Sequence, residues 1–125
     1  METVSIRLPA WPEYVRVVRL VAAGLAARLG FTIDDIDDLK IGVDELCGYL
    51  VGSSGRNGVL EIRFEIHPER IEITGTGTFS AEQTVPSELT VFSRQILDTV
   101  ADSATLQAAD GDGAPTFHLT KSRAW

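Results

Sequence analysis

Apolar residues recur along the chain with two different periods, and each period predicts one kind of element. Every second residue is apolar over residues 4–8 and, more clearly, over residues 60–66 and 71–73. This alternation predicts a first strand that ends at Pro9 and a later hairpin with its turn at Pro68. One apolar and one polar face on each strand indicate a sheet that is buried on one side and solvated on the other.

Spacings of three and four residues predict two consecutive helices. Pro12 is favoured in a first helical turn and Gly30 at a helix end, so the first helix is expected between them. Thr32 is a good N-cap for the second helix, which should end in the glycine- and serine-rich loop 52–58. The predicted buried stripe of this second helix is Ile36, Leu39, Val43, Leu46, Cys47 and Leu50.

Four aspartates lie near the start of the second helix, at residues 34, 35, 37 and 38. Acidic residues there complement the partial positive charge of the helix N-terminus. No nearby histidine or spaced oxygen ligand completes a calcium loop, so capping and solvation are expected rather than a metal site. His67, beside Pro68, is likewise expected to be a solvated turn residue rather than a ligand or base.

The last third of the chain predicts one more helix and one more hairpin. Residues 105–107 and 116–121 are expected to form the two strands, joined by a loop around residues 110–113. The helix is expected to begin at residues 86–88 and to bury one apolar face made of Leu89, Phe92, Ile96 and Val100.

The resulting order, β-α-α-β-β-α-β-β, predicts the fold class. It is an α/β (α+β) two-layer sandwich, with three helices on one face of a mainly antiparallel, roughly five-stranded sheet. An apolar content of 44% supplies a core for a chain of 125 residues. Because neither a repeat nor a linker interrupts the pattern, residues 1–125 are expected to form a single domain.

Composition and charge narrow the class of partner. The net charge of −7 argues against direct contact with nucleic acid or an anionic membrane, since both need basic patches. The N-terminus lacks the basic start of a secretory signal, and the most apolar window, residues 15–29, contains three arginines. Cys47 is the single cysteine and is expected to be a small core residue rather than a reactive thiol. These features predict a cytoplasmic protein.

The second helix holds two adjacent acids, Asp44 and Glu45, within an otherwise apolar run. Burying a carboxylate without a partner is unfavourable, so this position needs a physical reason. One reason is chemistry. The structural alternative for Glu45 is a partly buried carboxylate that is bonded to Tyr49 or to a backbone amide.

Two stretches of the chain match the motifs of a known family. Residues 8–15, followed by Arg19 and Leu20, are similar to that family's passage from the first strand into the first helix. Residues 37–47 are close to its second-helix motif, which combines apolar spacing with a lysine and a central glutamate. On these motifs the chain resembles the RsbW-type anti-sigma factors, bacterial serine-protein kinases with the histidine-kinase/Hsp90-like ATPase fold. It is identified as a divergent member of that family.

The resemblance implies a nucleotide pocket with altered residues. Glu45 matches the family's general base, but Tyr49, four residues on, replaces an asparagine that binds magnesium. A phenol is a poor ligand for that ion. Gly75 stands where the family has an aspartate that binds adenine, while Gly77 matches the glycine of the same motif. Together these four residues are expected to form a degenerate nucleotide pocket, with Glu45 as a vestigial general base.

The segment that holds the phosphates in the family is also altered. It contains no glycine over residues 87–92, and no lysine or arginine lies between Arg70 and Arg94. A polyanion therefore lacks both close backbone amides and a positive partner there. The resemblance thus implies a serine kinase fold with weak or no turnover. No cofactor and no metal are expected to bind, and ATP with magnesium only if the site proves functional.

The resemblance further implies a regulator of bacterial transcription in a stress response. Its partners would be a sigma factor of RNA polymerase and, in competition, a STAS-type anti-anti-sigma protein. Arg19 matches a first-helix arginine that faces the partner, and Arg16 is its nearest charged neighbour. Both arginines are equally compatible with solvated helix charges. An acidic protein suits a basic DNA-binding factor.

Two other functions stay open. One is an active ATP-dependent serine kinase that phosphorylates the antagonist, which requires Asp44 or another oxygen to replace the missing magnesium ligand. This is disfavoured because Asp44 points about 100° away from Glu45 around the helix. The other is a stand-alone scaffold or homodimerisation domain, for which the apolar first helix offers a surface.

Overall fold

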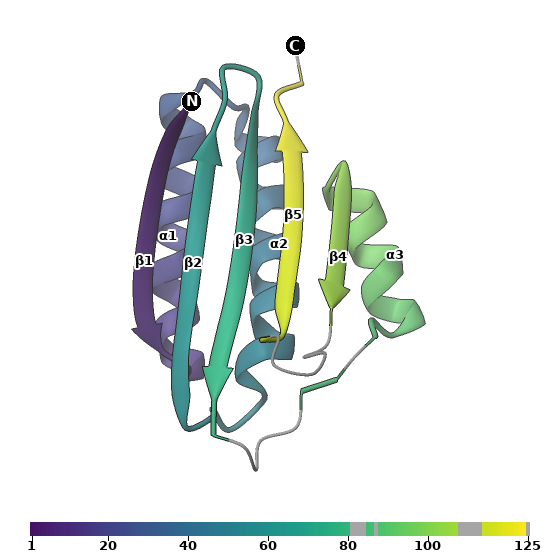
Figure 1. Ribbon diagram of the computed structural model, residues 1–125. Coiled ribbons are helices and arrows are strands. Elements are labelled where there is room, and N and C mark those ends of the chain that lie inside the picture. Colours follow the sequence, from purple (N-terminus) through teal and green to yellow (C-terminus); the bar gives the residue numbers. More distant parts are fainter. Residues whose placement is uncertain (81–84, 87, 108–113, 125) are drawn as a thin grey trace.

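The computed structural model describes residues 1–80, 85–86, 88–107 and 114–124 (Figure 1). The helices lie on one side of the sheet and leave its other side uncovered (Figure 1). The predicted element order and two-layer architecture are confirmed. In chain order the elements are β1 (Glu2–Pro9), α1 (Pro12–Arg28), α2 (Ile33–Val51), β2 (Gly58–Ile66), β3 (Arg70–Phe79), α3 (Val91–Val100), β4 (Ser103–Gln107) and β5 (Thr116–Ser122).

The sheet has five strands in the order β1-β2-β3-β5-β4, and every neighbouring pair is antiparallel. The β2–β3 hairpin sets Phe64 opposite Ile73 and Ile66 opposite Ile71. These partners share the buried face, so the hairpin alone supplies a strip of core. The same register places charged and threonine side chains on the uncovered face.

The second helix packs closely on the sheet. A Cβ added to Gly42 would lie 3.2 Å from the Leu119 side chain of β5, so a small residue is needed at this crossing. Cys47 is fully buried as predicted. Burial, with a smaller contribution from the nearby Asp44, raises the pKa of the Cys47 thiol and keeps it uncharged. The rest of the buried stripe of α2 is Leu39, Val43, Leu46, Leu50 and Val51.

The aspartates at the start of α2 combine capping with ion pairing. The Asp35 backbone N–H donates to Thr32 Oγ1 at 3.1 Å, which confirms the predicted cap. Lys121 of β5, only 9% exposed, places its Nζ 3.6 Å from Asp35 and 3.5 Å from Asp38. The two expected roles, capping and solvation, therefore do not describe Asp35 completely, because its carboxylate also pairs with a buried lysine. This carboxylate ties the helix to the sheet.

The third helix begins later than predicted. It starts at Val91 with Thr90 as N-cap, rather than at residues 86–88, because the Thr90 side chain accepts the Ser93 backbone N–H at 3.0 Å. The later start changes which side chains are buried. Phe92, predicted to be in the core, is 71% exposed. The buried residues of α3 are Ser93, Leu97 and Val100.

The turn of the β2–β3 hairpin differs from its prediction. His67, predicted to be solvated, has a side chain only 18% exposed, and its Nε2 lies 2.7 Å from Glu72 Oε2. The predicted loop at residues 110–113 lies outside the described residues. Within the ranges given above, none of the helices combines the length and the apolar character that crossing a membrane requires.

Candidate functional site

Glu45 lies in the middle of α2, where it contacts the first turn of α3. The Ser93 hydroxyl donates a hydrogen bond of 2.6 Å to Glu45 Oε2. Ser93 is 5% exposed, so this bond is shielded from water. Short hydroxyl–carboxylate bonds are among the stronger hydrogen bonds in proteins. The bond therefore fixes the start of α3 against α2.

Tyr49, one turn further along α2, extends this bond into a chain of hydrogen bonds. Its phenol oxygen accepts the Thr90 backbone N–H at 2.9 Å and donates to Ser93 Oγ at 2.8 Å. Since Ser93 donates in turn to Glu45, the donors follow one direction from Thr90 to Glu45. We call Thr90, Tyr49, Ser93 and Glu45 the α2–α3 network. The structural alternative predicted for Glu45 is a bond to Tyr49 or to a backbone amide. Among the described residues, Ser93 connects Glu45 with Tyr49.

The Tyr49 phenol is stabilised where it lies by partners within the chain. Its partial burial acts to raise the pKa of Tyr49, but hydrogen bonds with Ser93 and with the side chain and backbone of Thr90 act the other way. Their combined effect lowers the pKa of the phenol. The polar end of Tyr49 therefore needs no ligand to satisfy it.

The two glycines predicted for the pocket, Gly75 and Gly77, lie on the buried face of β3. A Cβ added to Gly75 would overlap the ring of Phe117, a fully buried residue of β5. A Cβ added to Gly77 would overlap the ring of Phe79. The glycines thus give room to aromatic side chains of the chain itself. An aspartate at position 75 has no room while Phe117 keeps its place.

Two of the backbone amides at the start of α3 are already bonded within the chain. The Thr90 N–H is bonded to Tyr49, and the Ser93 N–H to the Thr90 hydroxyl. Arg94 directs Nη1 to the Ala104 carbonyl at 2.8 Å. Anion binding at a helix N-terminus requires amides that point at the ligand without another acceptor. Much of the predicted phosphate-binding segment, residues 81–84 and 87, lies outside the described residues.

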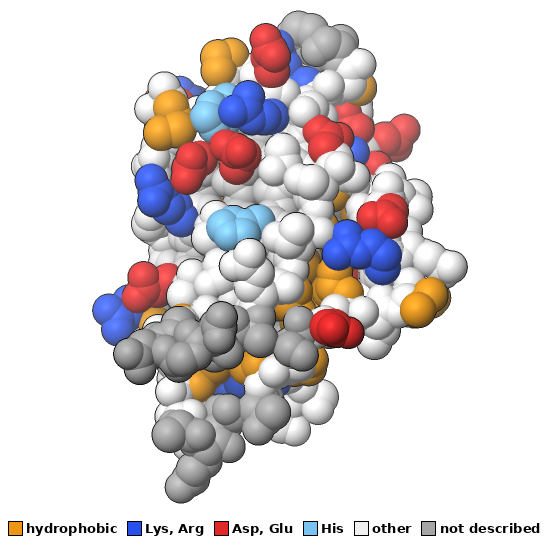
Figure 2. All heavy atoms as spheres, turned by 45° about the vertical axis from the view of Figure 1, so that its right-hand side comes forward, with side chains coloured by type: hydrophobic (Ala, Val, Ile, Leu, Met, Phe, Trp, Pro, Cys, Tyr) orange, Lys and Arg blue, Asp and Glu red, His pale blue; other side chains and the backbone are white. Residues whose placement is uncertain are grey.

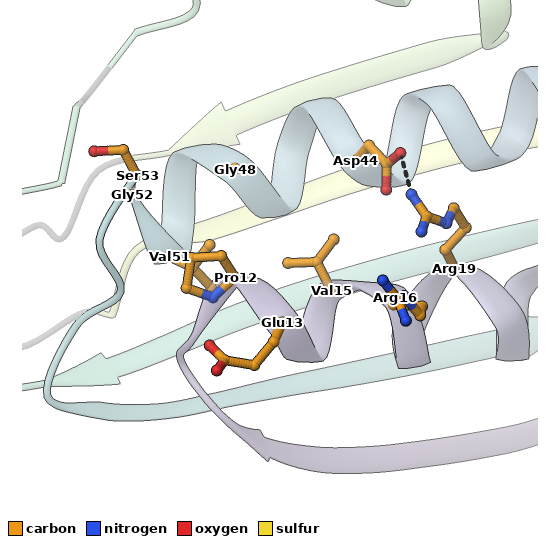
Figure 3. A pocket seen from close by; sticks show the side chains of 10 residues that line it. All are labelled: Pro12, Glu13, Val15, Arg16, Arg19, Asp44, Gly48, Val51, Gly52 and Ser53. Carbon is orange, nitrogen blue, oxygen red and sulfur yellow. Dashed lines mark hydrogen bonds and ion pairs between the residues drawn. The ribbon is translucent and has the colours of Figure 1, made fainter.

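A groove between α1 and α2 forms a second feature, on another side of α2 (Figure 3). Arg19 Nη1 lies 2.8 Å from Asp44 Oδ2, so Asp44 is turned toward α1 and away from the α2–α3 network. Arg16 is exposed and forms no ion pair within the part of the chain that the structure describes. The groove has a volume of about 340 Å³ and is lined by Pro12, Glu13, Val15, Arg16, Arg19, Asp44, Gly48, Val51, Gly52 and Ser53.

The ion pair in this groove is incompletely satisfied. Asp44 Oδ1 is buried and has no hydrogen-bond partner among the described residues. A buried acceptor without a donor costs about 1–3 kcal/mol. The Arg19–Asp44 pair is therefore less favourable than its short distance suggests, and the Asp44 carboxylate can still accept a hydrogen bond from a further donor.

The structure brings some predicted residues together and separates others. Glu45 and Tyr49 share one cluster, whereas Arg16 and Arg19 line the groove on another side of α2. Sequence reasoning missed Thr90 and Ser93. Their Thr-x-x-Ser spacing is a capping signal, but the proline at residue 86 offered an earlier helix start.

Comparisons with known proteins identify relatives over much of the chain. No protein-family model matches it. It is 41% identical over 73 residues to the serine-protein kinase RsbW of Bacillus subtilis, an alignment that covers 56% of this chain and 46% of that protein. It is 42% identical over 76 residues to RsbW of Halalkalibacterium halodurans, covering 60% and 47%. The match thus spans about half the length of these two relatives.

A third relative matches over a greater length. Serine-protein kinase RsbW of Bacillus licheniformis is 30% identical over 138 aligned positions, which cover 94% of this chain and 84% of that protein. Among solved structures, the RsbU and RsbW domains of Rv1364c from Mycobacterium tuberculosis superpose with a TM-score of 0.66 over 98% of this chain and 33% of that one. At 18% sequence identity, this likeness shows the fold alone.

Proposed function

The chain belongs to the RsbW family, and from this premise we propose that it is an anti-sigma-factor-like regulator of bacterial transcription with a degenerate nucleotide pocket. It binds a sigma factor of RNA polymerase, a STAS-type anti-anti-sigma protein, or both in competition. Because the match spans about half of several relatives, its activity and its partners are part of the proposal.

The α2–α3 network is the observation on which the degenerate pocket rests. In the family that the chain resembles, the asparagine that matches position 49 binds magnesium, and the glutamate that matches Glu45 acts as a general base. Here the Tyr49 phenol is bonded to Thr90 and Ser93, and Ser93 bonds the Glu45 carboxylate. Both groups thus have their partners within the chain. Magnesium also prefers compact oxygen ligands in octahedral geometry, which a phenol does not provide.

The adenine side of the pocket supports the same conclusion. Adenine recognition in the family requires a carboxylate at position 75, where this chain has glycine. The Phe117 ring takes up the space that a side chain there would need. The chain therefore lacks the adenine-binding carboxylate, and the fully buried Phe117 ring leaves no room to restore it.

The α1–α2 groove supports protein binding. Arg16 is exposed at its rim, and Arg19 is held by an ion pair that is only partly satisfied. Exposed apolar side chains lie on the same two helices, with Leu20 62% and Ile41 45% exposed. Arginine beside exposed apolar side chains is typical of protein interfaces. We expect the partner to place a carboxylate against Arg16.

An active kinase is a weaker second candidate. It needs an oxygen ligand that replaces the missing asparagine, and Asp44 is the adjacent acid. Asp44 is bonded to Arg19 across the groove, away from Glu45. If the Asp44 side chain turned toward the pocket, the ion pair would break and Arg19 would lose this partner. The geometry therefore disfavours Asp44 as the replacement ligand.

A binding titration with candidate partners tests the proposal. The sigma factors and STAS proteins encoded in the same genome are titrated into the chain, with and without Mg·ATP or Mg·ADP. We expect at least one to bind, with an affinity that the nucleotides leave unchanged. Coupled sites typically change each other's affinity about 5- to 150-fold. A nucleotide effect of that size contradicts the degenerate pocket, and failure of every candidate to bind contradicts the regulator.

A further inference from the structure

The uncovered face of the sheet holds a cluster that is separate from the network and the groove. It consists of Glu65 on β2, His67 at the hairpin turn and Glu72 on β3. Each offers one ligand atom, and these atoms all lie within 4.8 Å of one another. Over the described ranges, no other group of three histidine, cysteine or acidic residues has this geometry. Figure 2 shows histidine, acidic and basic side chains side by side on this part of the surface.

The backbone holds the cluster together. Glu65 and Glu72 are direct partners across the β2–β3 ladder, so their Cβ atoms are about 4.5–5.5 Å apart. The turn between them is closed by the His67 N–H, which bonds the Arg70 carbonyl at 3.0 Å. Two like charges directly opposite each other destabilise a sheet. A cation between the two carboxylates would remove that repulsion.

The ligand types fit a borderline divalent metal. One imidazole nitrogen and two carboxylate oxygens form a set of three protein ligands of the kind that zinc accepts. Zinc bonds of about 2.0–2.2 Å place neighbouring ligand atoms roughly 3.3 Å apart. His67 Nε2 and Glu72 Oε2 now share a hydrogen bond of 2.7 Å, which zinc would replace by binding both atoms. All the ligand atoms lie within 4.8 Å of one another, so they need to move by little to reach that spacing.

Space for a fourth ligand lies next to the cluster. A hollow of about 390 Å³ on the sheet surface is lined by Glu65 and Glu72 together with residues of β3 and β5. A water molecule can complete a tetrahedral site from this side. The three side chains are partly shielded from water, since Glu65 is 28%, His67 18% and Glu72 38% exposed. Water therefore competes less strongly with a metal ion for the two carboxylates than it would at a fully exposed site.

Two arginines compete with a metal for the carboxylates, but weakly. Arg63 Nε lies 3.6 Å from Glu65 and Arg70 Nη2 lies 3.9 Å from Glu72. Both distances are long for ion pairs, and both arginine side chains are well exposed, at 56% and 41%. Exposed pairs of this kind contribute little free energy. Either arginine can turn to solvent when a divalent cation binds.

We infer that Glu65, His67 and Glu72 form a binding site for a divalent transition-metal ion of the zinc type. The site departs from the expectation that His67 is only a turn residue. Magnesium is disfavoured because it prefers oxygen ligands in octahedral geometry. The site is independent of the proposed regulatory function. Glu65 and Glu72 alternate with the buried residues of β2 and β3, so they lie on the sheet face that the helices leave uncovered.

Calorimetric titration with zinc chloride tests the site. The wild-type chain should bind one zinc ion and show no binding of magnesium under the same conditions. His67→Ala should weaken zinc binding by at least about tenfold, because the loss of a direct ligand exceeds the roughly 10- to 100-fold effect of its supporting residues. Glu65→Gln keeps the shape and removes one carboxylate, and it should also weaken zinc binding.

A second glutamate of β2 provides the matched control. Glu61 lies on the same sheet face as Glu65, pairs with Arg7 at 4.0 Å, and is outside both the cluster and the hollow. Glu61→Gln should bind zinc as the wild type does. The inference is overturned if the wild type shows no saturable zinc binding, or if His67→Ala retains the wild-type affinity. It is equally overturned if Glu61→Gln and Glu65→Gln lose zinc affinity to the same extent.

Discussion

Tyr49 satisfies three polar groups at one point of the molecule. Its phenol binds the Thr90 amide and the Ser93 hydroxyl directly, and supports Glu45 through Ser93. A polar group in such a position that loses its partner destabilises the fold by about 1–3 kcal/mol. Tyr49 is a poor magnesium ligand but it stabilises the fold. Its contribution to the free energy of unfolding can be measured without any nucleotide present.

Removing the Tyr49 hydroxyl should weaken the fold. Tyr49→Phe is expected to lower the free energy of unfolding by about 1–2 kcal/mol, because Thr90 N–H and the Ser93 hydroxyl lose a partner. Denaturation in guanidinium chloride measures the change. Tyr14→Phe is the control, since the Tyr14 hydroxyl has no hydrogen bond within the described residues. An equal loss in both variants would show that the network contributes nothing specific.

Gly75 should not accept even the smallest side chain. Gly75→Ala is expected to lower the free energy of unfolding by about 1–3 kcal/mol, because the new Cβ overlaps the Phe117 ring. Gly75→Asp, which restores the family's acid, should be at least as unstable and should not gain ATP binding. In the control Gly24→Ala, nothing lies within 4 Å of the added Cβ, and this variant should be as stable as the wild type or more so. Wild-type stability of Gly75→Ala would contradict the proposed packing.

At the scale of elements, α3 shows why boundaries are harder to predict than elements. Its existence follows from the apolar spacing, but its first residue depends on a cap formed by Thr90 and on a contact with Tyr49, 41 residues earlier in the chain. A long-range contact of this kind leaves no local pattern. Because the helix starts later, the Phe92 side chain is exposed to solvent, and the Ser93 side chain points into the α2–α3 network.

The Thr90 cap should therefore contribute measurably to α3. Thr90→Ala is expected to lower the free energy of unfolding by about 1 kcal/mol, because the Ser93 N–H loses its acceptor. In this variant, backbone amide hydrogen exchange should speed up more in the first turn of α3 than in α2. Thr99→Ala is the control, since Thr99 only bonds the Gln95 carbonyl of its own helix at an exposed position. A stability loss in Thr99→Ala as large as in Thr90→Ala would contradict the assigned cap.

At the scale of the whole molecule, α2 separates two surfaces with different properties. One of its sides bears the α2–α3 network, and another lines the groove with Asp44. The proposed partner site and the proposed nucleotide pocket therefore use different side chains of α2. Under the proposed function, this separation allows partner binding at the groove to continue without nucleotide binding at the α2–α3 network.

Charge reversal in the groove should weaken partner binding specifically. Arg16→Glu is expected to lower the affinity for the sigma factor or STAS protein by at least tenfold, about 1.4 kcal/mol. The substitution places a carboxylate next to the carboxylate that we expect on the partner, and the two negative charges repel each other. Surface plasmon resonance measures the loss. Arg28→Glu makes the same charge change at the far end of α1, where Arg28 pairs with Glu2, and should have little effect. Equal losses would assign the effect to net charge rather than to the groove.

The fold followed from the sequence more completely than the site did. Alternation in the hairpin and the stripe of α2 are local patterns, and both predicted what the structure shows. The partners of Glu45 and the overlap between Gly75 and Phe117 join segments far apart in the chain. Such contacts depend on how helices and strands pack. The sequence alone therefore identified Glu45 and Tyr49 as unusual without showing that Ser93 connects them.

Calorimetric titration of the wild-type chain with Mg·ATP tests the degenerate pocket most directly. With Tyr49, Ser93 and Glu45 bonded to one another and Phe117 over Gly75, we predict no saturable binding up to about 1 mM ATP, which corresponds to a binding free energy weaker than about −4.1 kcal/mol. A dissociation constant in the micromolar range would contradict it, because the nucleotide would then have to open the α2–α3 network at little cost.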